Sequence, residues 1–119
     1  LALYENTPLE KAVRICTRLF DDPEVNIRDA AFKITKNKPD AICLFAQARE
    51  GKCNFIFAAS EEVKVSMNDV MKETMEKLGG KGGGSAQLAQ GGIGGKVDLE
   101  RIIQEAQALV RKKLDESST

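Results

Sequence analysis

The first β-rich stretch of the chain is residues 13–20, where apolar and more polar side chains alternate. Val13, Ile15 and Leu19 occupy one set of alternate positions, and Arg14 and Arg18 occupy the other. A period of two places successive side chains on opposite faces of a strand. This stretch therefore predicts a β-strand with one wetter face.

Two further β-rich runs follow at residues 41–48 and 53–59. The sequence REGK connects them, and its Gly51 can adopt the positive φ that tight turns require. The two runs predict an antiparallel hairpin, whose edge is then open to pairing with a second copy of the chain.

Three stretches show the three- and four-residue spacing of apolar positions that is typical of amphipathic helices. Each begins directly behind a side chain that can cap a helix. The pairs of cap and helix are Asn26 with 27–36, Ser66 with 67–78, and Asp98 with 99–114. Gly79 follows the second helix, where a left-handed residue is favoured.

The order of these elements predicts an α/β fold, with a mixed β-sheet and covering helices. A short strand at residues 85–90 is expected at an edge of the sheet or inserted in it. The 119 residues are enough for one domain, which we place at residues 12–119. Residues 1–11 contain Pro8 and few apolar side chains, and we expect them to be a connector from an upstream segment of a longer parent protein.

Composition limits the chemistry. The 18 basic and 18 acidic residues cancel, so a polyanion would have to be met by a local positive patch. The sequence has no histidine, which removes the commonest general base and the usual transition-metal ligand. We therefore expect neither a self-contained active site nor a cofactor in this fragment.

The cysteines and the hydropathy of the chain bear on the cellular compartment of the protein. The three cysteines fall in apolar stretches without a CxxC pair, which disfavours a disulfide framework and a thiolate zinc site. No apolar run approaches the length of a membrane span. These features predict a cytoplasmic protein that makes no contact with a membrane.

The most unusual feature is the glycine-rich sequence KLGGKGGGSAQLAQGG at residues 77–92. A Walker A loop needs Gly-Lys-Ser/Thr, whereas glycines follow Lys81 and precede Ser85, and no GxGxxG register fits. A flexible linker is the simplest alternative, but this segment lies between two helices of one domain. We interpret residues 79–84 as an ordered loop whose bare backbone is contacted closely by a ligand.

The sequence LGGKGGG, followed by AQ and a further glycine pair, resembles the signature of the DHH-associated domain at the C-terminus of alanyl-tRNA synthetases. The resemblance extends over residues 13–114. Two departures bear on function. Many synthetases carry a basic residue where this chain has Ser85, and DHH phosphoesterases have a histidine after the glycines, which this chain lacks.

The resemblance implies a tRNA-binding appendage that grips the outer corner of tRNA, tRNA-Ala in particular, and supports aminoacylation and editing by upstream domains of the same chain. ATP and magnesium would then belong to the upstream catalytic domain. A homodimer is a further implied partner. The alternatives are the substrate-binding lobe of a DHH-family phosphoesterase and a homo-oligomerisation domain.

The residues expected to contact RNA come from the glycine-rich segment and its flanks, because side-chain-free backbone can approach a sugar–phosphate chain. The lysines among them can instead be ordinary solvated surface residues. The expected residues are Lys77, Gly79, Gly80, Lys81, Gly82, Gly83, Gly84, Ser85, Gln87, Gln90, Gly91, Gly92 and Lys96.

Overall fold

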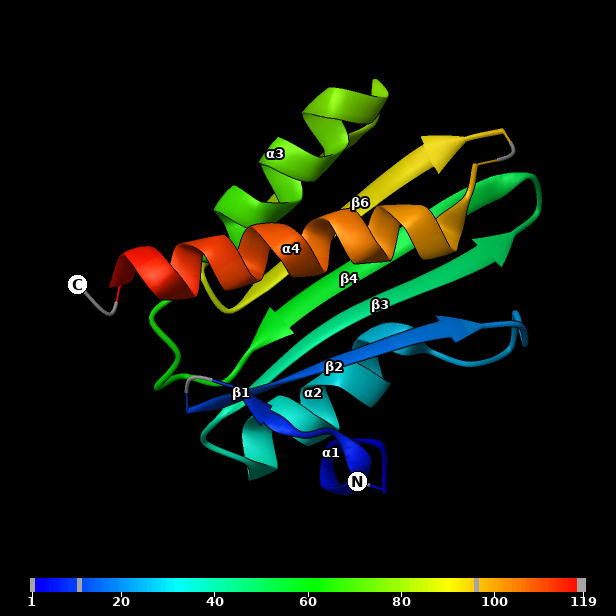
Figure 1. The fold of residues 1–119 in the computed structure, drawn as a ribbon. Coiled ribbons are helices and arrows are strands. Elements are labelled where there is room, and N and C mark those ends of the chain that lie inside the picture. The colour runs from blue at the N-terminus through cyan, green and yellow to red at the C-terminus, as the bar shows by residue number, and fades with distance from the viewer. Residues whose placement is uncertain (1, 11, 96, 118–119) are drawn as a thin grey trace.

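The computed structural model describes residues 2–10, 12–95 and 97–117. A mixed sheet lies between two layers of helices (Figure 1), which confirms the expected α/β fold class. The elements in chain order are α1 (Ala2–Asn6), β1 (Leu9–Glu10), β2 (Val13–Phe20), α2 (Ile27–Asn37), β3 (Ala41–Arg49), β4 (Lys52–Ala59), α3 (Met67–Leu78), β5 (Lys81–Gly84), β6 (Leu88–Gly94) and α4 (Leu99–Ser117).

The sheet has six strands in the order β1-β2-β3-β4-β6-β5. β2 and β3 run parallel, joined by the crossover helix α2, and the other neighbouring strands are antiparallel. The hairpin β3–β4 is therefore in the middle of the sheet, with neighbours on both sides. The expectation that its edge could pair with a second copy is wrong, because the edges belong to β1 and β5.

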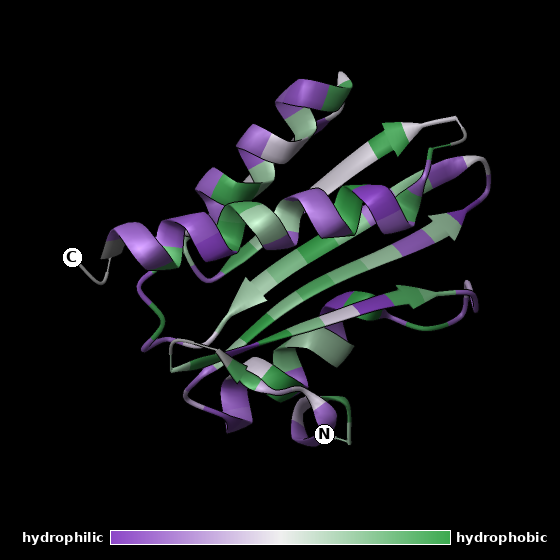
Figure 2. Cartoon of the chain, viewed as in Figure 1, coloured by the Kyte–Doolittle hydropathy of each residue, from purple (hydrophilic) through white to green (hydrophobic). Residues whose placement is uncertain are grey.

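Both faces of the sheet are covered near its centre. α3 and α4 lie on one face and α2 on the other (Figure 1), and each layer closes a separate cluster of buried apolar side chains. The central strands β3 and β4 are mainly apolar along their length (Figure 2), as expected for strands buried on both sides.

The alternation in β2 is correct, but its second face is exposed only at Arg18. Val13 and Ile15 face the α3–α4 layer, whereas Cys16 and Phe20 are buried under the opposite layer. Arg14 on this second face is half-buried. Its guanidinium carbon lies 4.5 Å from the centroid of the Tyr4 ring. Both the aliphatic part and the charged end of the Arg14 side chain therefore take part in packing.

The helix ends follow the capping residues seen in the sequence. The side chains of Asn26 and Ser66 accept from the backbone N–H of Asp29 and Asp69. The Asp98 carboxylate accepts from the N–H of Arg101 at 3.2 Å. Gly79 ends α3 with φ of 73°. Each predicted helix therefore begins where its cap indicated.

The N-terminal segment, expected to be a connector, contains elements that pack on the domain. Tyr4 of α1 is buried, and its hydroxyl donates to Asp40 Oδ1 at 2.6 Å. Its ring lies 4.5 Å from the Arg14 guanidinium carbon and 5.1 Å from Lys38 Nζ. Tyr4 thus ties α1 to β2 and to the turn before β3.

The Tyr4 hydroxyl provides a test of this contact. Its pKa is raised above 10.0, mainly because the phenol donates a hydrogen bond to Asp40. The contribution of this bond to stability is therefore present below pH 10 and is lost as pH rises through the folded pKa. Tyr4 is the one tyrosine of this chain, which has no tryptophan, so tyrosinate absorbance reports it alone.

We expect Asp40→Asn to lower the midpoint of that titration toward the ordinary tyrosine value, because the negative charge that opposes ionisation is gone. Asp21→Asn, an exposed aspartate at the other end of β2, is the control and should leave the midpoint unchanged. Equal midpoints for the wild type and Asp40→Asn would contradict the contact.

Candidate nucleic-acid interface

The glycine-rich segment is a β-hairpin rather than a loop. Residues 81–84 form β5, which pairs antiparallel with β6, and residues 85–87 make the turn between them. The expectation of a Gly-rich loop at residues 79–84 is therefore wrong, because the glycines continue the sheet beyond β4. Of the short strand expected at residues 85–90, the first half is the turn and only the second half is strand, as the start of β6, which is inserted between β4 and β5.

The glycines allow this hairpin to lie directly against α3. A Cβ atom added to Gly82 would lie 2.7 Å from Met71 Cγ and 2.9 Å from the carbonyl oxygen of Gln90. One added to Gly91, its register partner, would lie 2.5 Å from Met71 Sδ. On this face, the close approach that the glycines permit is to the protein's own helix.

The opposite face of the same hairpin is open. Gln90 and Gly92 of β6 lie on the α2 side of the sheet, and Lys81 pairs with Gly92 in the register. α2 packs on β3 and β4, and among the described residues no helix covers β6 and β5 on that side (Figure 1). A Cβ at Gly92 would meet only ordinary contacts, at 3.7 and 3.8 Å.

Two pockets lie along this open face, one toward each end of α2. The first, which we call the loop pocket, encloses about 360 Å³. It is lined by the residues before and at the start of α2, by β3 and β4, and by Gln90. Arg28, Arg49 and Asn54 provide its donors, and Glu24 is an acid in the same wall.

The loop pocket has one buried polar side chain, Gln47. Its exposed fraction is 3%, and its Nε2 donates to the carbonyl oxygens of Asp22 and Val25 at 2.8 and 2.9 Å. Gln47 therefore holds the loop between β2 and α2 against the sheet. The side chains left for a ligand are those of Arg28, Arg49, Asn54 and Gln90.

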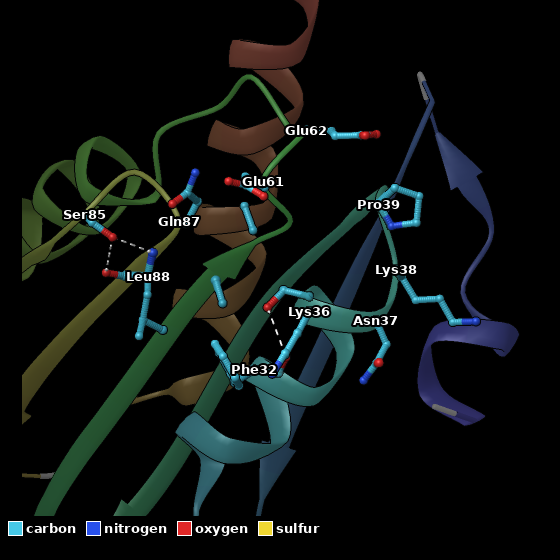
Figure 3. A pocket seen from close by; sticks show the side chains of 13 residues that line it. Phe32, Lys36, Asn37, Lys38, Pro39, Glu61, Glu62, Ser85, Gln87 and Leu88 are labelled. Carbon is cyan, nitrogen blue, oxygen red and sulfur yellow. Dashed lines mark hydrogen bonds between the residues drawn. The ribbon is translucent and has the colours of Figure 1, made fainter.

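The second pocket lies between the C-terminal half of α2 and the β5–β6 turn, and we call it the hairpin pocket. It encloses about 570 Å³ (Figure 3). Two of the expected contact residues, Ser85 and Gln87, belong to it. Phe32 and Lys36 of α2 form the opposite wall. The pockets follow each other along β6, because Leu88 lines one and Gln90 the other.

The structure brings some of the expected RNA contacts together and separates others. Ser85, Gln87, Gln90 and Lys81 are exposed on or beside the open face. Lys77 is exposed on the last turn of α3, in the layer on the other side of the sheet (Figure 1). Lys96 lies outside the described residues. Contact of any of these residues with RNA stays a prediction.

The contribution of α2 was not predicted from the sequence. Arg28, Phe32 and Lys36 are all exposed and recur every fourth residue, so they form one stripe on this helix. That spacing could have been recognised as a second, outward-facing stripe beside the apolar one. Its position opposite β6 depends on the crossover from β2 to β3, which the sequence pattern does not specify.

The clearest pKa shifts belong to groups that line neither pocket. Cys16 and Cys43 are buried register partners on β2 and β3. The pKa of the Cys16 thiol is lowered to about 7, mainly by its hydrogen bond with Cys43. The pKa of Lys113 is raised by its pairing with Glu73, at 2.8 Å between α4 and α3. These groups lie within the sheet and between α4 and α3, away from the open face.

Metal-ligand clusters and membrane-spanning helices are both absent from the described part of the chain. Its residues contain no cluster of three or more histidine, cysteine, aspartate or glutamate side chains suited to a metal ion. None of the helices in the same part combines the length and the apolar character needed to cross a bilayer.

Comparison with known proteins identifies the family of this fold and hairpin. The DHHA1 domain profile matches residues 15–112, which is most of the chain. The chain belongs to the DHHA1 domain family. The crystal structure of the C-Ala domain from Aquifex aeolicus alanyl-tRNA synthetase is similar to this DHHA1 domain. The TM-score is 0.67 at 30% sequence identity, over 86% of this chain and 91% of that chain.

Curated relatives of the DHHA1 domain act on alanine tRNA, as their names state. An alanine–tRNA ligase from Leptospira biflexa is 27% identical over 105 residues, which is 85% of this chain and 11% of the ligase. The alanyl-tRNA editing protein AlaX-L from Pyrococcus horikoshii is 38% identical over 92 residues, which is 75% of this chain and 21% of that protein. The chain thus spans a small part of the relatives it matches.

The contrast between the two faces of the hairpin gives a stability prediction. We expect Gly82→Ala to destabilise the DHHA1 domain by about 1–3 kcal/mol, because the new methyl group meets Met71 and the backbone of Gln90. Gly92→Ala is the matched control on the open face. It should be neutral or stabilising by up to about 1 kcal/mol, through a less flexible unfolded chain.

Urea unfolding of the two variants measures the difference. Equal destabilisation of both would show that the packing against α3 does not explain why residue 82 is glycine.

Proposed function

We propose that this DHHA1 domain binds tRNA as an accessory domain of a protein that acts on alanine tRNA. The observation that carries the proposal is the open face beside α2, where backbone with few side chains is flanked by two pockets. The similarity to the C-Ala domain of an alanyl-tRNA synthetase and to proteins named for alanine tRNA supports the same function.

The shape of the open face suits a folded RNA. Structured RNA is recognised largely through shape, sugar hydroxyls and phosphates, and these groups need close approach more than deep pockets. At Gly92 the sheet presents bare main chain on the α2 side. A sugar–phosphate chain can therefore approach the backbone of β6 closely.

The charges beside this face favour a polyanion locally. Arg28 and Arg49 flank the loop pocket, Lys36 lies in the hairpin pocket, and Lys81 projects from β5. Glu24 in the first pocket, and Glu61 and Glu62 in the second, oppose them in part. The four cations named here exceed the three acids by one, and this small positive excess suits an accessory contact rather than a tight phosphate clamp.

The relatives indicate two kinds of parent protein. In a ligase, ATP and magnesium would be bound by a catalytic domain upstream of this one. In an editing protein, the domain would serve hydrolysis of a mischarged tRNA, and the 38% identity to the Pyrococcus editing protein favours this second candidate. In both, the same contact with tRNA-Ala is proposed in a cytoplasmic protein.

The mechanism of such an appendage is to raise effective concentration. A second contact on the same tRNA makes binding by the neighbouring domain intramolecular, which increases affinity without a new contact at the reacting end. None of the residues of this domain needs to touch the acceptor end for that effect. This agrees with the chemistry of the open face, which offers hydrogen-bond donors and bare backbone.

Binding of a tRNA-Ala transcript, measured by fluorescence anisotropy at several salt concentrations, tests the proposal. We expect Lys81→Glu and Arg28→Glu each to weaken binding, and to reduce the salt dependence by roughly one unit for each phosphate that is no longer neutralised. Lys112→Glu is the charge-matched control, because Lys112 is exposed on α4 in the layer on the other side of the sheet.

Two results would oppose the proposal. One is a folded wild-type domain that does not bind any tRNA at low salt. The other is Lys112→Glu weakening binding as much as Lys81→Glu, which would show that only net charge matters. Preference for short oligonucleotides over tRNA would favour the alternative, the substrate lobe of a phosphoesterase.

A further inference from the structure

The hairpin pocket contains an aromatic side chain that the core does not use. Phe32 is 52% exposed, although it is one of five phenylalanines in a chain with little aromatic content. We propose that the hairpin pocket holds one unstacked base of a bound RNA against the ring of Phe32. This inference rests on the proposed tRNA binding and specifies a subsite for it.

Phe32 is placed where a base could stack on it. It comes from the outward stripe of α2 and forms one wall of a cavity of about 570 Å³, with Leu88 of β6 in the same lining (Figure 3). A cavity of this size is within the range of sites that hold small organic groups. Stacking on aromatic side chains is the usual way in which proteins bind splayed RNA bases.

Polar groups in the lining of the same pocket can recognise the edge of a base. Asn37 Nδ2 donates to the carbonyl oxygen of Lys33 at 2.6 Å, which leaves Asn37 Oδ1 as an acceptor. Gln87 is exposed in the β5–β6 turn and carries both a donor and an acceptor on its amide. An amide of this type can form paired hydrogen bonds with the edge of a base.

Ser85 was expected among the RNA contacts, but its hydroxyl is engaged inside the turn. Its Oγ accepts from the backbone N–H of Leu88 at 3.1 Å and lies 3.4 Å from the carbonyl oxygen of Leu88. Ser85 therefore shapes the pocket and keeps Gln87 at its rim. Recognition falls to Gln87 and Asn37 rather than to this serine.

The charges of the hairpin pocket favour an uncharged group inside it. Lys36 Nζ lies 5.5 Å from the centroid of the Phe32 ring, whereas Lys38 Nζ lies over Tyr4, on α1. Glu61 and Glu62 line the pocket and would repel a phosphate placed next to them. A base can occupy the pocket while its phosphate passes Lys36, so a nucleotide fits better than a free phosphate.

A short single-stranded RNA with one 2-aminopurine tests the subsite, because the fluorescence of this base falls when it stacks. We expect the wild-type domain to quench the probe, and Phe32→Ala to abolish the quenching and weaken binding by about 5- to 150-fold. Phe32→Leu keeps the apolar bulk without the ring and should weaken binding in the same way. Phe32→Tyr keeps the ring and should retain quenching.

Urea unfolding of Phe32→Ala and Phe32→Leu shows whether each variant is folded, so that loss of stacking can be distinguished from loss of folding. Gln87→Ala should retain quenching but reduce the preference among the four nucleoside monophosphates, used as free probes. Binding of these monophosphates without quenching of the RNA probe would overturn the inference, because it would assign the pocket to a free nucleotide.

The subsite and the proposed function can fail separately. If tRNA binds and Lys81→Glu weakens it, but Phe32→Ala and Phe32→Leu do not, the base subsite is wrong and tRNA binding stands. If the RNA probe is quenched through Phe32 but no tRNA binds, the subsite stands and the proposed function is wrong.

Discussion

The contact on which this domain depends is the packing of bare backbone at Gly82 and Gly91 against the Met71 side chain of α3. Gly82 and Gly91 are register partners, and each lies where a methyl group would collide with Met71. Methionine is well suited to this position, because its unbranched thioether fills the irregular space over a bare strand. The hairpin and the helix that precedes it are therefore one packing unit.

This contact also explains why one face of the hairpin stays open. It draws the hairpin toward α3, whereas the crossover helix α2 covers only β3 and β4 on the opposite face. The sheet thus extends two strands beyond its cover on the α2 side, and the two pockets lie along the border of this uncovered part. The glycines therefore affect both faces of the hairpin. They allow close packing against α3 on one face, and they leave few side chains on the other.

The elements were largely predictable because each has a local cause. Asn26, Ser66 and Asp98 cap the helices that follow them, and Gly51 turns the central hairpin with φ of 77°. The glycine-rich segment was not predictable in the same way. A run of glycines has neither strand propensity nor a hydrophobic pattern, so its pairing with β6 depends on packing against α3 that no pattern within the segment indicates.

The candidate site was predictable only in part, for the same physical reason. Gln87 and Gln90 were expected because they lie beside the glycines, and both line pockets on the open face. Phe32 and Arg28 were not expected, since nothing local in the sequence shows that α2 lies next to β6. The parallel pairing of β2 with β3 places this helix there, and pairing between distant strands is what a single sequence specifies least.

The thinness of the sheet at β6 has a mechanical consequence. At Gly91, next to Gly92 in β6, an added Cβ would lie 2.5 Å from Met71 Sδ and 3.1 Å from Met75 Sδ, so only main chain separates the outer face from these sulfur atoms. A displacement of β6 from its outer side would therefore shift the side chains of Met71 and Met75 directly. If a ligand binds the open face as proposed, the methyl groups of Met71 and Met75 would report its binding, although both residues are buried on the opposite side of the sheet.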